Sequence, residues 1–157
     1  MDHLHLTHFI AAPAQVVFDL SRHIGLHQIS QQKYKEEAVR GTRSGLVKKD
    51  DLITWRARHL GKIRFLTVKI TQLETPLLIE NTMTEGDFKS FVHRLHFKQI
   101  ANGTIVVEEL FFESPYGLLG RIFNTVFLRQ YLTQLIQERT KVIKTYAEGN
   151  KWKALLQ

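Results

Sequence analysis

Apolar and polar residues alternate along much of the chain, which is the pattern of half-buried β-strands. The alternation runs over residues 3–10 and returns from residue 51 onward. Between these segments, Pro13 and apolar residues at helical spacing predict one short helix, and a second short helical piece ends near Ile29. Residues 36–47 are weakly patterned and predict a short strand.

Residues 51–73 predict a β-hairpin that turns at Leu60-Gly61. A two-residue turn places Trp55 opposite Leu66, with both apolar side chains on the same face. The other face, together with the turn, then carries four basic residues: Arg56, Arg58, Lys62 and Lys69.

Three further strands are predicted, over residues 77–83, 88–100 and 104–113. Asn102-Gly103 is a turn signal between the last two strands, because both central residues of a type I′ turn need positive φ. From Leu119 to Glu148 apolar residues recur at helical spacing, and Gly149 ends this helix. The order predicts an α+β fold: a curved antiparallel sheet wrapped around a long C-terminal helix, with two short helices after the first strand.

The composition fits one globular domain over residues 1–157, with 43% hydrophobic and 24% charged residues. No apolar run approaches the ~20 residues that cross a bilayer, and the N-terminus does not resemble a secretory signal. The chain has no cysteine, which excludes disulfides and thiolate chemistry. We therefore expect a cytoplasmic protein.

The chain is basic, with 22 Lys and Arg against 15 Asp and Glu and a formal charge of +7. This excess favours an anionic partner such as a phospholipid surface, although it also suits a basic protein without one. Basic residues are spread along the sequence, so a nucleic-acid-binding arm is not expected. The sequence does not indicate an oligomeric state.

Several motifs resemble a known superfamily: "APAQVVFDLSR", "EEAVRGTRSGL", "TWRARHLG", "LTVKIT", "FKSFVHRLHF" and "ESPYGLLGRIFNTVFLRQYL". Over roughly Leu6 to Glu148 the chain looks like the START, polyketide-cyclase and birch-pollen-allergen superfamily (SRPBCC). Within it, the chain is similar to a bacterial subgroup labelled cyclase/dehydrase-like or cell-division inhibitor. The resemblance implies a helix-grip fold whose cavity holds lipids, sterols, polyketides or other apolar ligands. Only some members are enzymes, and Leu95 stands where the subgroup has a second histidine.

His93 and Glu108 are the polar residues expected on the inner face of the last two strands. The predicted turn places His93 opposite Phe112 and Glu108 opposite Phe97. The two are then four residues apart along the sheet, about 13 Å at ~3.3 Å per residue, which predicts no hydrogen-bonded pair. Glu108 would either have a pKa raised by burial or bond a donor such as Arg or Lys. His93 would either contact a ligand or bond a polar neighbour.

A cavity lined by aromatic and apolar residues is predicted between the sheet and the long helix, with a filled core as the alternative. Asn81, His93 and Glu108 would orient the polar end of a ligand there. The candidate ligand-binding residues are Trp55, Asn81, Met83, Phe91, His93, Leu95, Phe97, Glu108, Leu110, Phe112, Phe123, Phe127 and Tyr131.

No metal or cofactor is expected. His23 and His27 have the i, i+4 spacing of a helical metal pair, but Gly25 lies between them and no third ligand is evident. The sequence also lacks a phosphate-binding glycine loop, a dinucleotide fingerprint, a nucleophile elbow and HExxH.

Three functions therefore remain open. The first is the binding of a hydrophobic or amphiphilic small molecule. The second is a cyclase, dehydratase or hydrolase acting on a polyketide-like or aromatic substrate, with Glu108 or His93 as a single acid or base. The third is binding to an anionic surface through Arg56, Arg58 and Lys62.

Overall fold

The alternating segments of the sequence form the strands of one antiparallel sheet. The computed structural model describes residues 1–114 and 118–157, and for residues 118–125 it describes only the backbone. The strands are β1 (Asp2–Ile10), β2 (Glu37–Gly41), β3 (Leu52–His59), β4 (Lys62–Glu74), β5 (Leu78–Glu85), β6 (Ser90–Ile100) and β7 (Gly103–Glu113). The helices are α1 (Ala14–Ser21), α2 (Ile24–Ser30), the 3₁₀ turn Gln32–Tyr34, α3 (Leu118–Glu148) and α4 (Lys151–Leu155).

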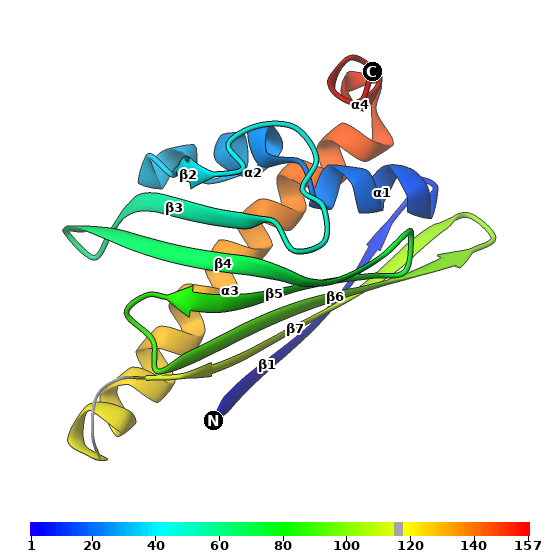
Figure 1. Ribbon diagram of the computed structural model, residues 1–157. Helices are drawn as coiled ribbons and strands as arrows, with labels where there is room; N and C mark the ends of the chain where they lie inside the picture. Colours follow the sequence, from blue (N-terminus) through cyan, green and yellow to red (C-terminus); the bar gives the residue numbers. More distant parts are fainter. Residues whose placement is uncertain (115–117) are drawn as a thin grey trace.

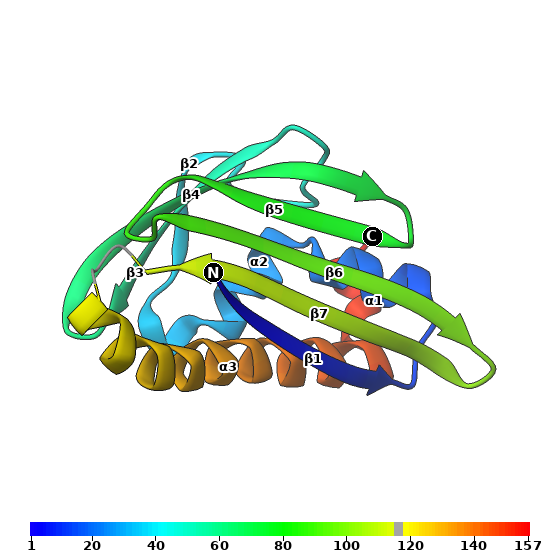
Figure 2. The same cartoon turned by 90° about the horizontal axis from the view of Figure 1, so that it is seen from below.

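The seven strands are ordered β1-β7-β6-β5-β4-β3-β2, so the N-terminal strand is an edge strand that pairs with β7. The sheet curves, and α3 runs along its inner side with α1 and α2 next to it (Figures 1 and 2). This confirms the predicted α+β arrangement, including the two short helices after the first strand. No helix in the described part of the chain is long and apolar enough to cross a bilayer.

The β3–β4 hairpin has the predicted register. Trp55 pairs with Leu66, and Leu60 and Gly61 form the turn with φ angles of 54° and 77°. Two successive positive φ values are those of a type I′ turn, which matches the twist of the flanking strands. The inner face therefore receives the apolar residues that the alternation predicted.

The β6–β7 register differs from the prediction. Ile100 pairs with Gly103, so the two turn residues are Ala101 and Asn102 instead of Asn102 and Gly103. Gly103 does not have a positive φ. Glycine is needed there for close packing, because a Cβ would lie 2.4 Å from the carbonyl oxygen of Ile10 in the neighbouring strand. The change moves β7 by two residues relative to β6.

The core consists of three clusters of buried apolar residues beneath the sheet. One lies under α1 and the C-terminal half of α3 and includes Phe18, Leu95 and Phe97. Side chains of the C-terminal segment also pack on it, among them Trp152. The other two clusters lie under β3 and β4 and beneath β7, and between them the interior is not completely filled.

Candidate ligand-binding site

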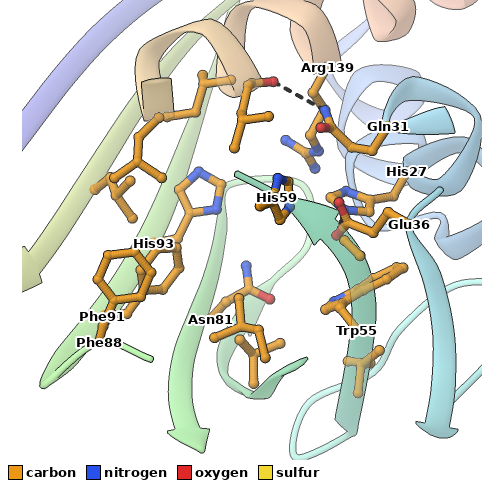
Figure 3. Close-up of a pocket in the computed structure, with 18 of the residues that line it drawn as sticks. His27, Gln31, Glu36, Trp55, His59, Asn81, Phe88, Phe91, His93 and Arg139 are labelled. Atoms are coloured by element: carbon orange, nitrogen blue, oxygen red, sulfur yellow. Dashed lines mark hydrogen bonds and ion pairs between the residues drawn. The ribbon is translucent and has the colours of Figure 1, made fainter. Parts of the chain in front are cut away.

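A cavity of about 330 Å³ lies between the inner face of the sheet and the helices α2 and α3 (Figure 3). The filled core that the sequence left open as an alternative is therefore not what the structure shows. Much of the cavity lining is apolar and comes from β3, β4, β7 and α3. Examples are Ile53, Trp55, Leu66, Val68, Leu110, Leu132 and Ile136. Polar and charged side chains also belong to the lining, among them Gln31, Asn81, His93, Glu108 and Arg139.

Seven of the predicted ligand-binding residues line this cavity. They are Trp55, Asn81, Phe91, His93, Glu108, Leu110 and Tyr131. Their contact with a ligand remains a prediction.

Five predicted residues do not line the cavity, although alternation places those from the sheet on its inner face. Leu95 and Phe97 lie in the core beneath α1, where the Phe97 ring meets the Phe18 ring edge-on at 5.2 Å. Phe112 is buried beneath the middle of α3. The remaining two are Met83, beside Gly86, and Phe127, which is 42% exposed on α3. The side chain of Phe123 lies outside the described residues.

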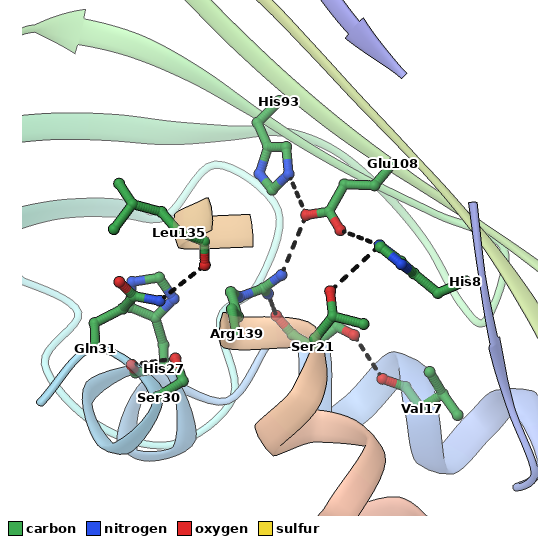
Figure 4. A network of polar contacts seen from close by, with 11 residues as sticks. His8, Val17, Ser21, His27, Ser30, Gln31, His93, Glu108, Leu135 and Arg139 are labelled. Atoms are coloured by element: carbon green, nitrogen blue, oxygen red, sulfur yellow. Dashed lines mark hydrogen bonds and ion pairs between the residues drawn. The ribbon is translucent and has the colours of Figure 1, made fainter. Parts of the chain in front are cut away.

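His93 and Glu108 form a hydrogen-bonded pair, with 2.6 Å between His93 Nε2 and Glu108 Oε1 (Figure 4). The predicted separation of about 13 Å is therefore wrong. Glu108 pairs with Leu95 instead of Phe97, which brings it two residues closer to His93 along the sheet. Both residues line the cavity.

Glu108 has two further partners. His8 Nε2 of β1 lies 3.2 Å from Glu108 Oε2, and Arg139 Nη1 of α3 lies 3.5 Å from Glu108 Oε1. Arg139 also donates to the carbonyl oxygen of Ser21 at 2.6 Å. The carboxylate therefore joins β1, β6, β7 and α3 at one buried point.

His8 and Arg139 are not among the residues predicted from the sequence, yet both carry a recognisable signal. His8 comes two residues after Leu6 and so faces the core side of its strand. Arg139 comes three residues after Ile136, on the apolar stripe of the long helix. A charged or titratable residue in phase with buried positions usually has a buried partner.

Burial raises the pKa of Glu108, but hydrogen bonds from His8 and His93 and the nearby charge of Arg139 outweigh it and lower the pKa below its ordinary value. The sequence left two possibilities for Glu108, a pKa raised by burial or a bond to a donor, and the structure has the bond to donors. An ionised carboxylate only accepts hydrogen bonds, so His93 Nε2 carries the shared proton. Glu108 is then an orienting group for His93, not a proton donor.

A second polar group lies at the α2 side of the cavity. His27 Nε2 donates to Glu36 Oε1 at 2.8 Å, and His59 Nδ1 lies 2.6 Å from the hydroxyl of Tyr131. Burial raises the pKa of Glu36, but the charge and the hydrogen bond of His27 lower it. The lowering effects outweigh burial, so the pKa of Glu36 lies below its ordinary value. Burial lowers the pKa of His59 and raises that of Tyr131.

Gln31 and Asn81 contribute the amides of the cavity. Gln31 Nε2 donates to the carbonyl oxygen of Leu135 at 3.2 Å, while its buried Oε1 has no partner in the described part of the chain. Asn81 lies on β5 directly opposite His93 on β6. These positions place amide and imidazole groups beside the apolar part of the lining.

The histidines with metal-like spacing are used otherwise. His23 Nδ1 accepts a hydrogen bond from the backbone of Leu26 at 3.1 Å and caps α2, and His27 is the partner of Glu36. Among the described residues, no group of three or more His, Cys, Asp or Glu side chains is placed to hold a metal ion.

The basic outer face is partly neutralised. Arg56 lies 3.4 Å from Glu37, and Lys69 lies 3.8 Å from Asp50. Arg58 and Lys62 are exposed at the β3–β4 hairpin. Binding of an anionic surface there remains a prediction.

A curved antiparallel sheet closed over a long C-terminal helix defines the helix-grip fold of START and birch-pollen-allergen-like proteins. The chain is similar in structure to major latex-like protein 151 of Panax ginseng (TM-score 0.70, 13% identity, 94% of this chain and 98% of that chain). It is also similar to a START superfamily protein of Mycobacterium smegmatis (TM-score 0.70, 12% identity, 93% and 97%). A third similar structure is a protein of Thermus thermophilus (TM-score 0.67, 20% identity, 98% of both chains).

No protein-family model matches the sequence, and no curated protein matches it either. At these identities the likeness shows the fold. The superfamily resemblance of the sequence motifs is therefore confirmed at the level of the fold.

Proposed function

We propose that the protein binds an apolar or amphiphilic small molecule in the cavity between the sheet and α3. The observation that carries this proposal is the cavity itself, about 330 Å³ and lined largely by apolar side chains. Ligand sites commonly occupy ~300–1,000 Å³ and combine apolar walls with a few polar groups. Burial of apolar ligand surface, at ~25 cal/mol per Å², supplies most of the affinity.

Asn81 and His93 are proposed to contact a polar group of an amphiphilic ligand. They face each other across β5 and β6, and both line the cavity. Glu108 supports this contact by fixing the His93 ring at 2.6 Å. A ring with one nitrogen held in this way presents the rest of its edge in a defined orientation.

Native mass spectrometry of protein purified from its host tests this function, together with a thermal-shift panel of lipids, sterols and polyketides. A ligand at 100 times its Kd stabilises the folded protein by about 2.7 kcal/mol, which gives a clear rise in Tm. Asn81→Leu should weaken binding of amphiphiles more than binding of hydrocarbons. If no panel member raises the Tm and no ligand co-purifies, the proposed function is wrong.

The His93–Glu108 pair favours a second candidate, an acid–base enzyme on a polyketide-like or aromatic substrate. A base oriented by a carboxylate is a recurring arrangement in such catalysts, and His93 reaches the cavity. The test is to incubate each ligand found above with the protein and follow its mass. His93→Gln should abolish a conversion without abolishing binding, and a conversion that survives substitution of both His93 and Glu108 by Gln would exclude this mechanism.

A further inference from the structure

Gln31 lines the cavity and has a buried hydrogen-bond acceptor without a partner among the described residues. Gln31 follows α2 directly, is 3% exposed and lines the cavity (Figure 3). Its Nε2 donates to the Leu135 carbonyl oxygen at 3.2 Å, which fixes the orientation of the amide. If the amide were flipped, Gln31 Oε1 would face the Leu135 carbonyl oxygen, and both atoms are acceptors. Nε2 is therefore the bonded atom and Oε1 the unpaired one.

This unpaired oxygen is unusual within the described residues. Only one other buried side-chain polar atom there has no partner, Ser90 Oγ, and Ser90 does not line the cavity. Buried polar atoms in native proteins are nearly always hydrogen-bonded, and an exception calls for an explanation. A donor on a bound ligand would satisfy Gln31 Oε1.

Other polar groups near Gln31 already have partners inside the protein. Glu36 accepts from His27, and the Tyr131 hydroxyl bonds His59. Arg139 donates to the Ser21 carbonyl oxygen and lies beside Glu108. None of these groups is a hydrogen-bond partner of Gln31 Oε1 within the described residues.

The formal charges on the described lining residues are also balanced. The three arginines are paired with carboxylates: Arg22 with Asp19, Arg64 with Asp87 and Arg139 with Glu108. The remaining carboxylate of the lining, Glu36, is paired with His27. An anionic ligand would find no unpaired cation here and would bring its charge towards Glu36 and Glu108.

We propose that the cavity selects an uncharged apolar alcohol or phenol whose hydroxyl donates to Gln31 Oε1. This inference rests on the proposed ligand-binding function and names the chemical class of the ligand. A hydroxyl group can donate one hydrogen bond and accept others, which suits an unpaired acceptor such as Gln31 Oε1. Carboxylates and ethers of the same skeleton lack the donor.

Three small probes with one skeleton test this selectivity: 2-naphthol, 2-methoxynaphthalene and 2-naphthoate, titrated calorimetrically at pH 7. We expect the naphthol to bind about three- to tenfold more tightly than the ether, the value of one hydrogen bond. The naphthoate should bind more weakly than the naphthol. Gln31→Met, which keeps the length of the side chain without a strong acceptor, should remove the advantage of the naphthol, whereas Ser90→Ala should retain it.

Equal affinity of the wild-type protein for the naphthol and the ether would overturn this inference and leave apolar ligand binding intact. Tightest binding of the naphthoate would overturn it as well, because it would indicate an anion site at Arg139. An advantage for the naphthol that survives in Gln31→Met would show that the hydroxyl is recognised elsewhere. If Gln31→Met does not fold, the three wild-type titrations still decide. Failure of all three probes, together with a silent lipid panel, would overturn the proposed function too.

Discussion

Two consecutive glutamates on β7 have different environments, because side chains alternate between the faces of a strand. Glu108 faces inward, is 2% exposed and is held by His8, His93 and Arg139. Glu109 faces outward, where it lies 3.2 Å from His3. The pair allows a buried and a surface carboxylate to be compared within one strand.

Glu108→Gln should lower the free energy of unfolding by about 3 kcal/mol, because it leaves the buried charge of Arg139 without its partner. Glu109→Gln should cost at most about 1 kcal/mol, as expected for a polar contact near the surface. Urea unfolding of both variants at pH 7 measures the two losses. Equal losses would show that the buried network contributes no more than a surface contact.

The low pKa of Glu108 also predicts how stability depends on pH. Its folded-state pKa lies below the unfolded value of ~4.3, so its contribution is fully present above that pH. The contribution is lost as the pH falls below ~4.3 towards the folded-state pKa. Unfolding free energies of wild type and Glu108→Gln, measured from pH 7 downward, should therefore converge in acid. A constant difference between them would contradict the assigned ionised state.

Leu60 has an unfavourable backbone conformation in the β3–β4 turn. Its φ is 54°, a left-handed value that costs non-glycine residues about 1 kcal/mol, and its side chain is 53% exposed. Leu60→Asn should therefore raise the free energy of unfolding by about 0.5–1 kcal/mol in urea titrations. Gly61→Ala is the matched control, since a Cβ there meets nothing within 4 Å and φ is 77°. It should destabilise through the backbone alone, and a loss of stability in Leu60→Asn would contradict this account.

At the scale of elements, local patterns predicted the strands and helices but not every register. The β3–β4 hairpin agrees with its sequence because Leu60 and Gly61 occupy the turn that their spacing indicated. The β6–β7 hairpin does not, because Gly103 is required by the approach of Ile10 from β1. That contact joins residues far apart in sequence, so no turn rule applied to neighbouring residues could reveal it.

Asn102→Ala distinguishes the two possible β6–β7 turns. Asn102 is exposed and does not have a positive φ, so the substitution should change the free energy of unfolding by no more than about 0.5 kcal/mol. A type I′ turn at Asn102-Gly103 would instead make it clearly destabilising. Gly103→Ala should cost ~2 kcal/mol or more, because the backbone of Ile10 leaves no room for a Cβ. Chemical denaturation of the two variants gives both values.

At the scale of the whole molecule, alternation identified the inner face but not which part of it borders the cavity. Leu95 and Phe97 face inward and are covered by α1, whereas His93 on the same strand reaches the cavity. His8 and Arg139 come from opposite ends of the sequence and meet only at Glu108. The location of the cavity depends on how helices cover the sheet, which is a property of tertiary packing and not of local periodicity.

Substitutions at two buried alanines can distinguish the cavity from the filled part of the core. Ala57 on β3 lines the cavity, and Ala147 on α3 belongs to the cluster beneath α1. Ala57→Leu should raise the free energy of unfolding by about 1 kcal/mol, because its added carbons bury apolar surface in existing space. It should also weaken naphthol binding at least tenfold by occupying the site. Ala147→Leu should instead cost about 1–3 kcal/mol through overpacking and leave binding unchanged.

Urea unfolding and naphthol titration of the two leucine variants measure both effects. Comparable destabilisation by Ala57→Leu and Ala147→Leu would mean that the space beside Ala57 is closed in solution. Unchanged naphthol affinity in a stable Ala57→Leu protein would mean that the ligand binds elsewhere. We expect Ala57→Leu to raise stability and weaken binding, and Ala147→Leu to do neither. This result is expected if the interior is filled at the Ala147 end and open at the Ala57 end.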